Sequence, residues 1–165
     1  MIDPAGSDAA RPATVADLQR LLAAFAKHDV EYVLIGGYAL FALGYERGTT
    51  DIDVLVKPTR AEGEKVKQAL LQLPDRAARD LDPAWFEEGN TIRIADEIVV
   101  DLLFSACGET LDSLKEHIVT IYLEDTPVRT LDIEGLLKTK QSLRHKDQED
   151  RQVLERALRV LRNGA

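Results

Sequence analysis

The chain has 165 residues, of which 45% are hydrophobic, and this suits one domain built around one core. Its formal net charge of −8 excludes a protein that coats nucleic acid by electrostatic attraction alone. No apolar stretch approaches the roughly 20 residues that span a membrane, the first residues lack the pattern of a signal peptide, and a single cysteine excludes an internal disulfide. We therefore predict a cytoplasmic protein with no membrane partner.

The first third of the chain alternates between helical and extended patterns. Ala, Pro, Gly and Asp dominate the start, which indicates a flexible tail. Thr14-Val-Ala-Asp17 then resembles a capping box in which Asp replaces the usual Glu, and apolar residues follow at helical spacing. In chain order, we predict a tail over 1–13, a helix over 14–28, a strand over 30–35, a short helix over 38–44 and a strand over 52–56.

The remaining residues continue this mixture. Thr59 and Glu62 form a second capping-box pattern, and Asp132 is a candidate N-cap. The stretch 74–90 has no clean period, so we predict a long loop or a broken helix, a kind of segment that often serves as a lid. The other predicted elements are helices over 59–73, 109–116, 132–144 and 147–162 and strands over 91–95, 98–104, 117–123 and 127–130.

This element order predicts the α/β (α+β) class, with a small, mixed central sheet flanked by helices. We expect a single folded domain over 14–165, whose C-terminal helical part covers about 132–162.

The most informative stretch lies between the first two predicted strands. The first strand ends at Gly36-Gly37, and Asp51 and Asp53 open the second. Side chains alternate along a strand, so both carboxylates point the same way, and they repel each other unless a cation lies between them. Backbone N–H groups of a glycine pair before a helix suit phosphate. The stretch therefore predicts a site for a metal ion and a nucleotide.

A third carboxylate, Asp101, lies in an otherwise apolar predicted strand. A buried, ionised carboxylate is costly unless it is paired or bound to a metal. Three readings stay open: an exposed position at a sheet edge, an ion pair with an arginine such as Arg93, or a metal ligand. With Asp51 and Asp53 it would form the oxygen ligand set that Mg²⁺ or Mn²⁺ prefers.

The order of these features resembles the DNA polymerase β-like nucleotidyltransferase superfamily. Its signature is a hydrophobic residue and two small residues, a spacer, and then Asp-hydrophobic-Asp/Glu-hydrophobic. In this chain it reads Ile35-Gly36-Gly37, thirteen residues, and Asp51-Ile52-Asp53-Val54. The preceding Arg47-x-Thr49-Thr50 is similar to the Arg-x-Thr of a small bacterial branch, which includes the AbiEii-type toxins and related uncharacterised nucleotidyltransferases.

A second match lies near the C-terminus, where basic residues gather. Residues 136–165 carry a net charge of +4, and the rest of the chain carries −12. Here Lys138-Thr-Lys140 and Arg144-x-Lys146-Asp147-x-x-Asp150 resemble the C-terminal element of the same branch. Taken alone, such a run also fits a solvated helix face with i,i+4 ion pairs.

The resemblance implies an enzyme that uses Mg²⁺ or Mn²⁺ to move a nucleoside monophosphate from an NTP such as ATP to a hydroxyl acceptor, releasing pyrophosphate. It implies that Asp51, Asp53 and Asp101 bind the metal, and that Asp101 takes the proton from the acceptor hydroxyl. The residues it implies for the nucleotide are Gly36, Gly37, Arg47, Thr50, Lys140 and Arg144. Arg47 also fits a surface ion pair with Glu46 or Asp51.

The acceptor stays open at this stage: an RNA end, a protein side chain or a small-molecule hydroxyl. The alternative function is a catalytically silent nucleotide- or partner-binding module of a toxin–antitoxin pair, although three retained carboxylates disfavour it. The histidines are scattered, and we interpret Cys107 as a buried, inert thiol. Trp85 and Phe86 would either fill the core or stack a base.

Overall fold

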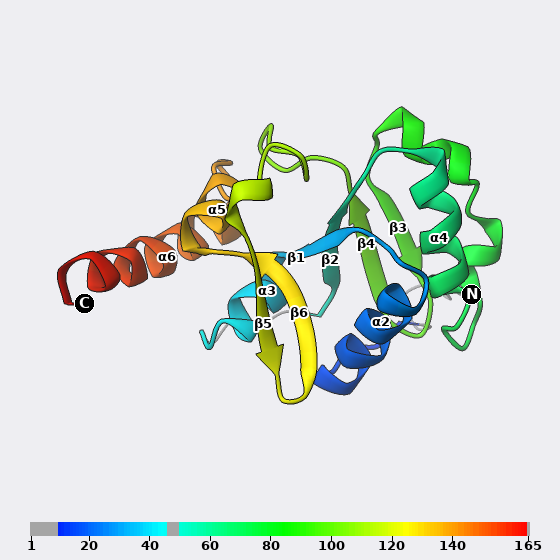
Figure 1. Cartoon of the computed structure of the whole chain (residues 1–165), viewed down its shortest axis with the longest axis horizontal. Helices are drawn as coiled ribbons and strands as arrows, with labels where there is room; N and C mark the ends of the chain where they lie inside the picture. Colours follow the sequence, from blue (N-terminus) through cyan, green and yellow to red (C-terminus); the bar gives the residue numbers. More distant parts are fainter. Residues whose placement is uncertain (1–9, 46–49, 165) are drawn as a thin grey trace.

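The structure, a computed structural model, describes residues 10–45 and 50–164, and its centre is a mixed sheet (Figure 1). The sheet has four strands in the order β1-β2-β4-β3, in which β2 and β4 are parallel and the outer pairs are antiparallel. β5 and β6 form a separate antiparallel hairpin, and β6 contacts β1. The strands are β1 (Tyr32–Ile35), β2 (Ile52–Val56), β3 (Ile92–Ala95), β4 (Val99–Leu103), β5 (Ile118–Leu123) and β6 (Thr126–Leu131). The prediction of a small, mixed sheet is confirmed.

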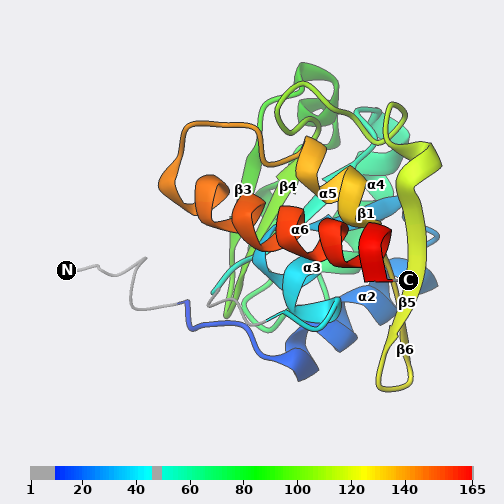
Figure 2. The ribbon, with the colours of Figure 1, turned by 90° about the vertical axis from the view of Figure 1, so that its left-hand side faces the viewer.

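Helices lie around this sheet, and α6 runs across one end of the molecule beside α5 (Figure 2). None of the described helices is long and apolar enough to cross a membrane. The α-helices are α2 (Val15–Lys27), α3 (Gly36–Ala42), α4 (Arg60–Leu70), α5 (Ile133–Lys138) and α6 (His145–Gly164). The short 3-10 helices are η1 (Ala77–Asp80), η2 (Pro83–Glu88) and η3 (Lys115–His117).

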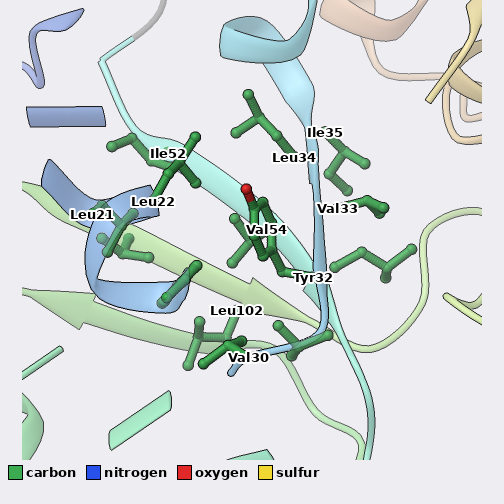
Figure 3. Packing of buried hydrophobic residues seen from close by; sticks show 14 of the residues in the cluster. Leu21, Leu22, Val30, Tyr32, Val33, Leu34, Ile35, Ile52, Val54 and Leu102 are labelled. Carbon is green, nitrogen blue, oxygen red and sulfur yellow. The ribbon is translucent and has the colours of Figure 1, made fainter. Parts of the chain in front are cut away.

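The core lies against the two inner strands β2 and β4 and the adjoining β1 (Figure 3). Val33 and Leu34, consecutive residues of β1, are both fully buried, as are Val54 of β2 and Leu102 of β4. Strands covered on both faces are mostly apolar, as in the unbroken run of β1, whereas β2 and β4 each contain one aspartate. Leu22 of α2 joins the same cluster.

The first capping box forms as predicted. The Thr14 hydroxyl accepts from the backbone N–H of Asp17, and the Asp17 carboxylate accepts from the backbone N–H of Thr14. The second forms only in part. Thr59 accepts from the backbone N–H of Glu62, but the Glu62 carboxylate accepts from the backbone N–H of Glu31 instead of closing the box.

The stretch 74–90 is irregular, as expected, and contains the two short 3-10 helices η1 and η2. Buried Asp96 anchors its start: the carboxylate accepts from the backbone N–H groups of Asp75 at 2.9 Å and Ala77 at 2.8 Å. Near the N-terminus, Arg11 and Ala13 fall in the segment predicted as a tail. Their backbone N–H groups donate to the carbonyl oxygens of Glu97 and Thr50, respectively, in the folded domain.

Several predicted helices differ from those in the structure. The short helix starts at Gly36 and so includes the glycine pair, and 109–116 is mostly turns, with only η3 at its end. The helix predicted over 132–144 starts after the Asp132 cap but ends at Lys138. The chain turns after it, and Arg151 of α6 donates to the carbonyl oxygens of residues 140 and 142.

Candidate active site

A polar cavity of about 210 Å³ opens where β1 leads into α3 and where the carboxylates of β2 and β4 lie. It gathers segments that are far apart in sequence, and most of the predicted site residues line it. The lining residues are Gly36, Gly37, Thr50, Asp51, Asp53, Arg93, Asp101, Lys140, Arg144, Lys146 and Asp147. Arg47, also predicted for this site, lies outside the described residues.

Asp53 and Asp101 are paired across the parallel strands β2 and β4, so their side chains lie on the same face of the sheet. The pKa of Asp53 is raised to about 7, first by burial and then by the negative charge of Asp101 and a hydrogen bond between the two carboxyls. Asp51 directly precedes β2 and adds a third carboxyl, whose Oδ1 accepts from the Thr50 hydroxyl at 3.0 Å.

Arg93 pairs with two of these carboxylates. Its Nε lies 2.9 Å from Oδ1 of Asp101 and its Nη2 lies 3.0 Å from Oδ2, while Nη2 also lies 3.3 Å from Oδ2 of Asp51. Of the readings left open for Asp101, exposure at a sheet edge is wrong, because β4 is an inner strand and Asp101 is buried. The ion pair with Arg93 is confirmed.

Gly36 is required by the approach of Asp53. Its φ is +75°, and a Cβ added there would lie 2.5 Å from Oδ2 of Asp53. A side chain at this position would therefore be strained in the backbone and would also collide with the carboxylate. The sequence did not predict this packing role for the first glycine.

Lys140 and Arg144 reach the cavity in different ways. Both were predicted to lie in the helix over 132–144, but they lie in the chain between α5 and α6. The Lys140 side chain is only 7% exposed, with Nζ 3.0 Å from Oδ2 of Asp150 and 3.9 Å from Oδ1 of Asp147. Arg144 is mostly exposed, and its Nη2 lies 3.1 Å from Oδ1 of Asp147. Lys140 is thus a buried ion-pair residue, whereas Arg144 lies at the solvent edge of the cavity.

Two features of the site were not assigned from the sequence: the bidentate contact of Arg93, and the roles of Asp147 and Asp150 as partners of Lys140. The first had a usable signal. β3 and β4 form a tight hairpin, and counting outward from residue 97 pairs Arg93 with Asp101. The second had none, because it depends on how α6 packs.

Among the described residues, no group of three or more His, Cys, Asp or Glu side chains is arranged to hold a metal ion. The chemistry of the donors nevertheless fits a divalent cation. The Arg93 guanidinium is a cation held by Asp51 and Asp101, and Asp53 beside them has a raised pKa, first because it is buried and then because of the negative charge of Asp101. All three offer the carboxylate oxygens that Mg²⁺ and Mn²⁺ prefer.

Other predicted features are divided between core and surface. Phe86 is fully buried and stacks edge-on against Phe104, whereas Trp85 is 41% exposed. Cys107 is exposed, so the prediction of a buried thiol is wrong; its backbone has a φ of +51°, in keeping with a turn.

Trp85 lines another cavity, of about 320 Å³, which we call the Trp85 groove. Its walls are Trp85, Glu88, Asn90, Thr91, Ile92 and Arg93.

Comparison by sequence finds no match among known protein families or curated proteins. Comparison of structures does find matches. A candidate nucleotidyltransferase from Thermotoga maritima superposes with a TM-score of 0.55 at 12% identity, over 92% of this chain and 93% of that one.

The second similar protein is the antibiotic-resistance factor ANT(2'')-Ia. Its solution structure matches with a TM-score of 0.53 at 15% identity, over 86% of this chain and 82% of the other. Its crystal structure with adenylyl-2''-tobramycin matches with a TM-score of 0.56 at 13% identity, over 87% of this chain and 88% of the other. The chain therefore has a nucleotidyltransferase-like fold.

Proposed function

We propose that this protein is a metal-dependent nucleotidyltransferase, which moves a nucleoside monophosphate from an NTP such as ATP to a hydroxyl acceptor and releases pyrophosphate. The observation that carries the proposal is the pairing of Asp53 with Asp101 on neighbouring parallel strands, with Asp51 at the same cavity. The likeness to nucleotidyltransferase structures supports it at the level of the fold.

Asp51, Asp53 and Asp101 would hold Mg²⁺ or Mn²⁺, which when bound would neutralise phosphate charge and make the acceptor hydroxyl more acidic. The carboxylate of Asp101 would take the proton from that hydroxyl. The hydroxyl oxygen then bonds to the α-phosphorus, and the bond from phosphorus to the bridging oxygen breaks, so that pyrophosphate leaves with the electron pair.

The nucleotide would be held at the solvent side of the cavity. Arg144 and Lys146 are exposed there and supply charge for the triphosphate, and the N–H groups of Gly36 and Gly37 supply donors. We revise the role of Lys140: because it is held by two buried carboxylates, it acts on the site by opposing the negative charge of Asp53.

One observation favours the silent module of a toxin–antitoxin pair as a second candidate. Arg93 already neutralises Asp51 and Asp101, and the described residues form no ready-made metal centre. In that case the cavity would bind a nucleotide or a protein partner without chemistry. We place transfer first, since a site without chemistry does not need Asp53 buried beside Asp101 at the cost of a raised pKa.

The test is transfer of label from each α-³²P-labelled NTP, with Mg²⁺ or Mn²⁺, to cell extract, total RNA, the protein itself or tobramycin. The last acceptor is included because a similar structure contains adenylyl-2''-tobramycin.

We expect one acceptor class to gain label, and we expect this labelling to be absent in EDTA and in the D53N variant. Because D53N removes a buried charge next to Asp101, its melting temperature in EDTA should rise, by about 3 °C, which separates lost chemistry from lost folding. D112N, which changes an exposed carboxyl away from the cavity, should retain transfer. Transfer that persists in EDTA or in D53N would contradict the proposal.

A further inference from the structure

We propose that Arg93 is a built-in counter-ion: it holds the carboxylates while the site lacks a divalent cation and moves into the Trp85 groove when the cation binds. This inference rests on the proposed function, because it takes Asp51, Asp53 and Asp101 as the cation's ligands.

The contacts of Arg93 use the oxygens that the cation would need. Both oxygens of Asp101 accept from its guanidinium, and Oδ2 of Asp51 accepts from the same Nη2. A planar guanidinium that binds a carboxylate through two nitrogens leaves it poorly able to ligate a divalent cation at the same time. The cation and the Arg93 guanidinium therefore compete for Asp101 and Asp51.

The Arg93 side chain can move away from the carboxylates. It lies on β3, which is the edge strand of the sheet, and its side chain is 61% exposed. Its side-chain hydrogen bonds to other described residues go to the two carboxylates that the cation would take. Once the cation neutralises them, nothing among these contacts holds the guanidinium in place.

The Trp85 groove offers it a second position. Arg93 lines both this groove and the carboxylate cavity, so a change of side-chain torsion angles moves its end from one to the other without a backbone shift. The groove contains the exposed ring of Trp85 and the carboxylate of Glu88. An aromatic face and a carboxylate are the two kinds of group that guanidinium binds best.

The consequence is a coupling between two adjacent parts of the molecule. Cation binding would change the charge and shape of the Trp85 groove, and any group that fills the groove would return Arg93 to the carboxylates and weaken cation binding. Such coupling is reciprocal by thermodynamic necessity.

Two measurements test this without relying on activity. The affinity for Mn²⁺ is obtained from the electron paramagnetic resonance signal of the free ion, in wild type, R93Q, R93K and the control R60Q, which removes an exposed arginine after the far end of β2. We expect Mn²⁺ to bind R93Q about tenfold more tightly than wild type, since a bidentate competitor is gone. R93K should bind more tightly than wild type too, because lysine retains the charge but not the fork. R60Q should match wild type.

The second measurement follows Trp85, the only tryptophan of the chain, by fluorescence during titration with Mg²⁺. Its emission should change along the binding curve in wild type and R60Q, and stay unchanged in R93Q. Equal Mn²⁺ affinities of wild type and R93K, or an unchanged Trp85 signal in wild type, would overturn the inference and leave the metal site standing. If neither wild type nor any variant binds Mn²⁺, or if D53N binds it as well as wild type, the proposed function itself fails.

Discussion

Asp17 is the residue whose pairing most directly links stability to pH. Its buried carboxylate accepts from Nη1 of Arg11 at 2.6 Å, from Arg20 and from the backbone N–H of Thr14. These contacts, that of Arg11 first, hold its pKa well below its usual range. Because the folded-state pKa is lowered, this stabilisation is present above the unfolded-state pKa, near 4, and is lost as the pH falls toward the folded-state value.

We predict that D17N lowers the free energy of unfolding by about 2 kcal/mol at pH 7. The difference from wild type should stay constant from pH 7 to pH 5 and shrink steadily between pH 4 and pH 2. Urea unfolding of both proteins across this range measures it. A difference that grows on acidification would show that Asp17 is not held ionised by Arg11.

Gly36 carries a prediction about the carboxylates. Both Gly36 and Gly44 have positive φ, +75° and +98°, so alanine at either position should cost about 1 kcal/mol of stability from backbone strain. Only at Gly36 does the new Cβ meet Asp53; at Gly44 nothing lies within 4 Å.

G36A should therefore lose nucleotidyl transfer and cation binding, whereas G44A should retain both at a similar melting temperature. Thermal unfolding and the labelled-NTP assay on the two variants provide the comparison. Equal activity of G36A and G44A would mean that the position of Asp53 does not matter for the chemistry.

At the scale of elements, the connection between α5 and α6 divides its basic residues into two roles. K140A would remove the lysine cation from the buried carboxylates of Asp150 and Asp147, of which Asp147 keeps its contact with Arg144, so we predict a loss of about 3 kcal/mol in the free energy of unfolding. R144A removes an exposed arginine and should leave stability within about 0.5 kcal/mol of wild type.

For nucleotide affinity we expect the reverse order, with the larger loss in R144A. R144A is expected to weaken NTP binding by about 1–3 kcal/mol, as loss of a charge-assisted contact does. Calorimetric titration with a non-hydrolysable NTP and urea unfolding test the pair, with K138A, an exposed lysine of α5, as the control. A stable K140A protein with weakened NTP binding would restore the direct phosphate role for Lys140.

The elements also show where local sequence signals suffice. Strand alternation predicted that Asp51 and Asp53 share a direction, and caps at Thr14 and Asp132 predicted two helix starts, because these features depend on neighbours in the chain. The end of α5 could not be predicted, since the carbonyl groups beyond it are satisfied by Arg151 of a different helix.

At the scale of the whole molecule, α6 is attached through its first half. Leu154 is fully buried, whereas Leu161, two turns further along, is 57% exposed. The spacing of Leu154 and Leu161 places both on one face of the helix. Only the half of it that meets the rest of the protein is covered.

L154A should lower the free energy of unfolding by about 3 kcal/mol, and L161A by less than about 1 kcal/mol. Because α6 supplies Asp147 and Asp150, L154A should also weaken the hold on Lys140, while L161A leaves the site intact. Urea unfolding separates the two variants. Similar losses in both would mean that the outer half of α6 packs against the protein in solution.

The sequence by itself determined the mixed sheet, the two neighbouring carboxylates at the second strand, and the net positive charge near the C-terminus, because each depends on the period, spacing or charge of nearby residues. The tertiary structure alone decided that Arg93 also contacts Asp51, that Lys140 is buried between Asp147 and Asp150, and that Gly36 must lack a side chain. These are contacts between residues 7 to 42 positions apart in the chain. Each of these polar side chains could pair with several others in the sequence. The packing of strands and helices decides which of them come into contact, and that packing depends on the whole chain.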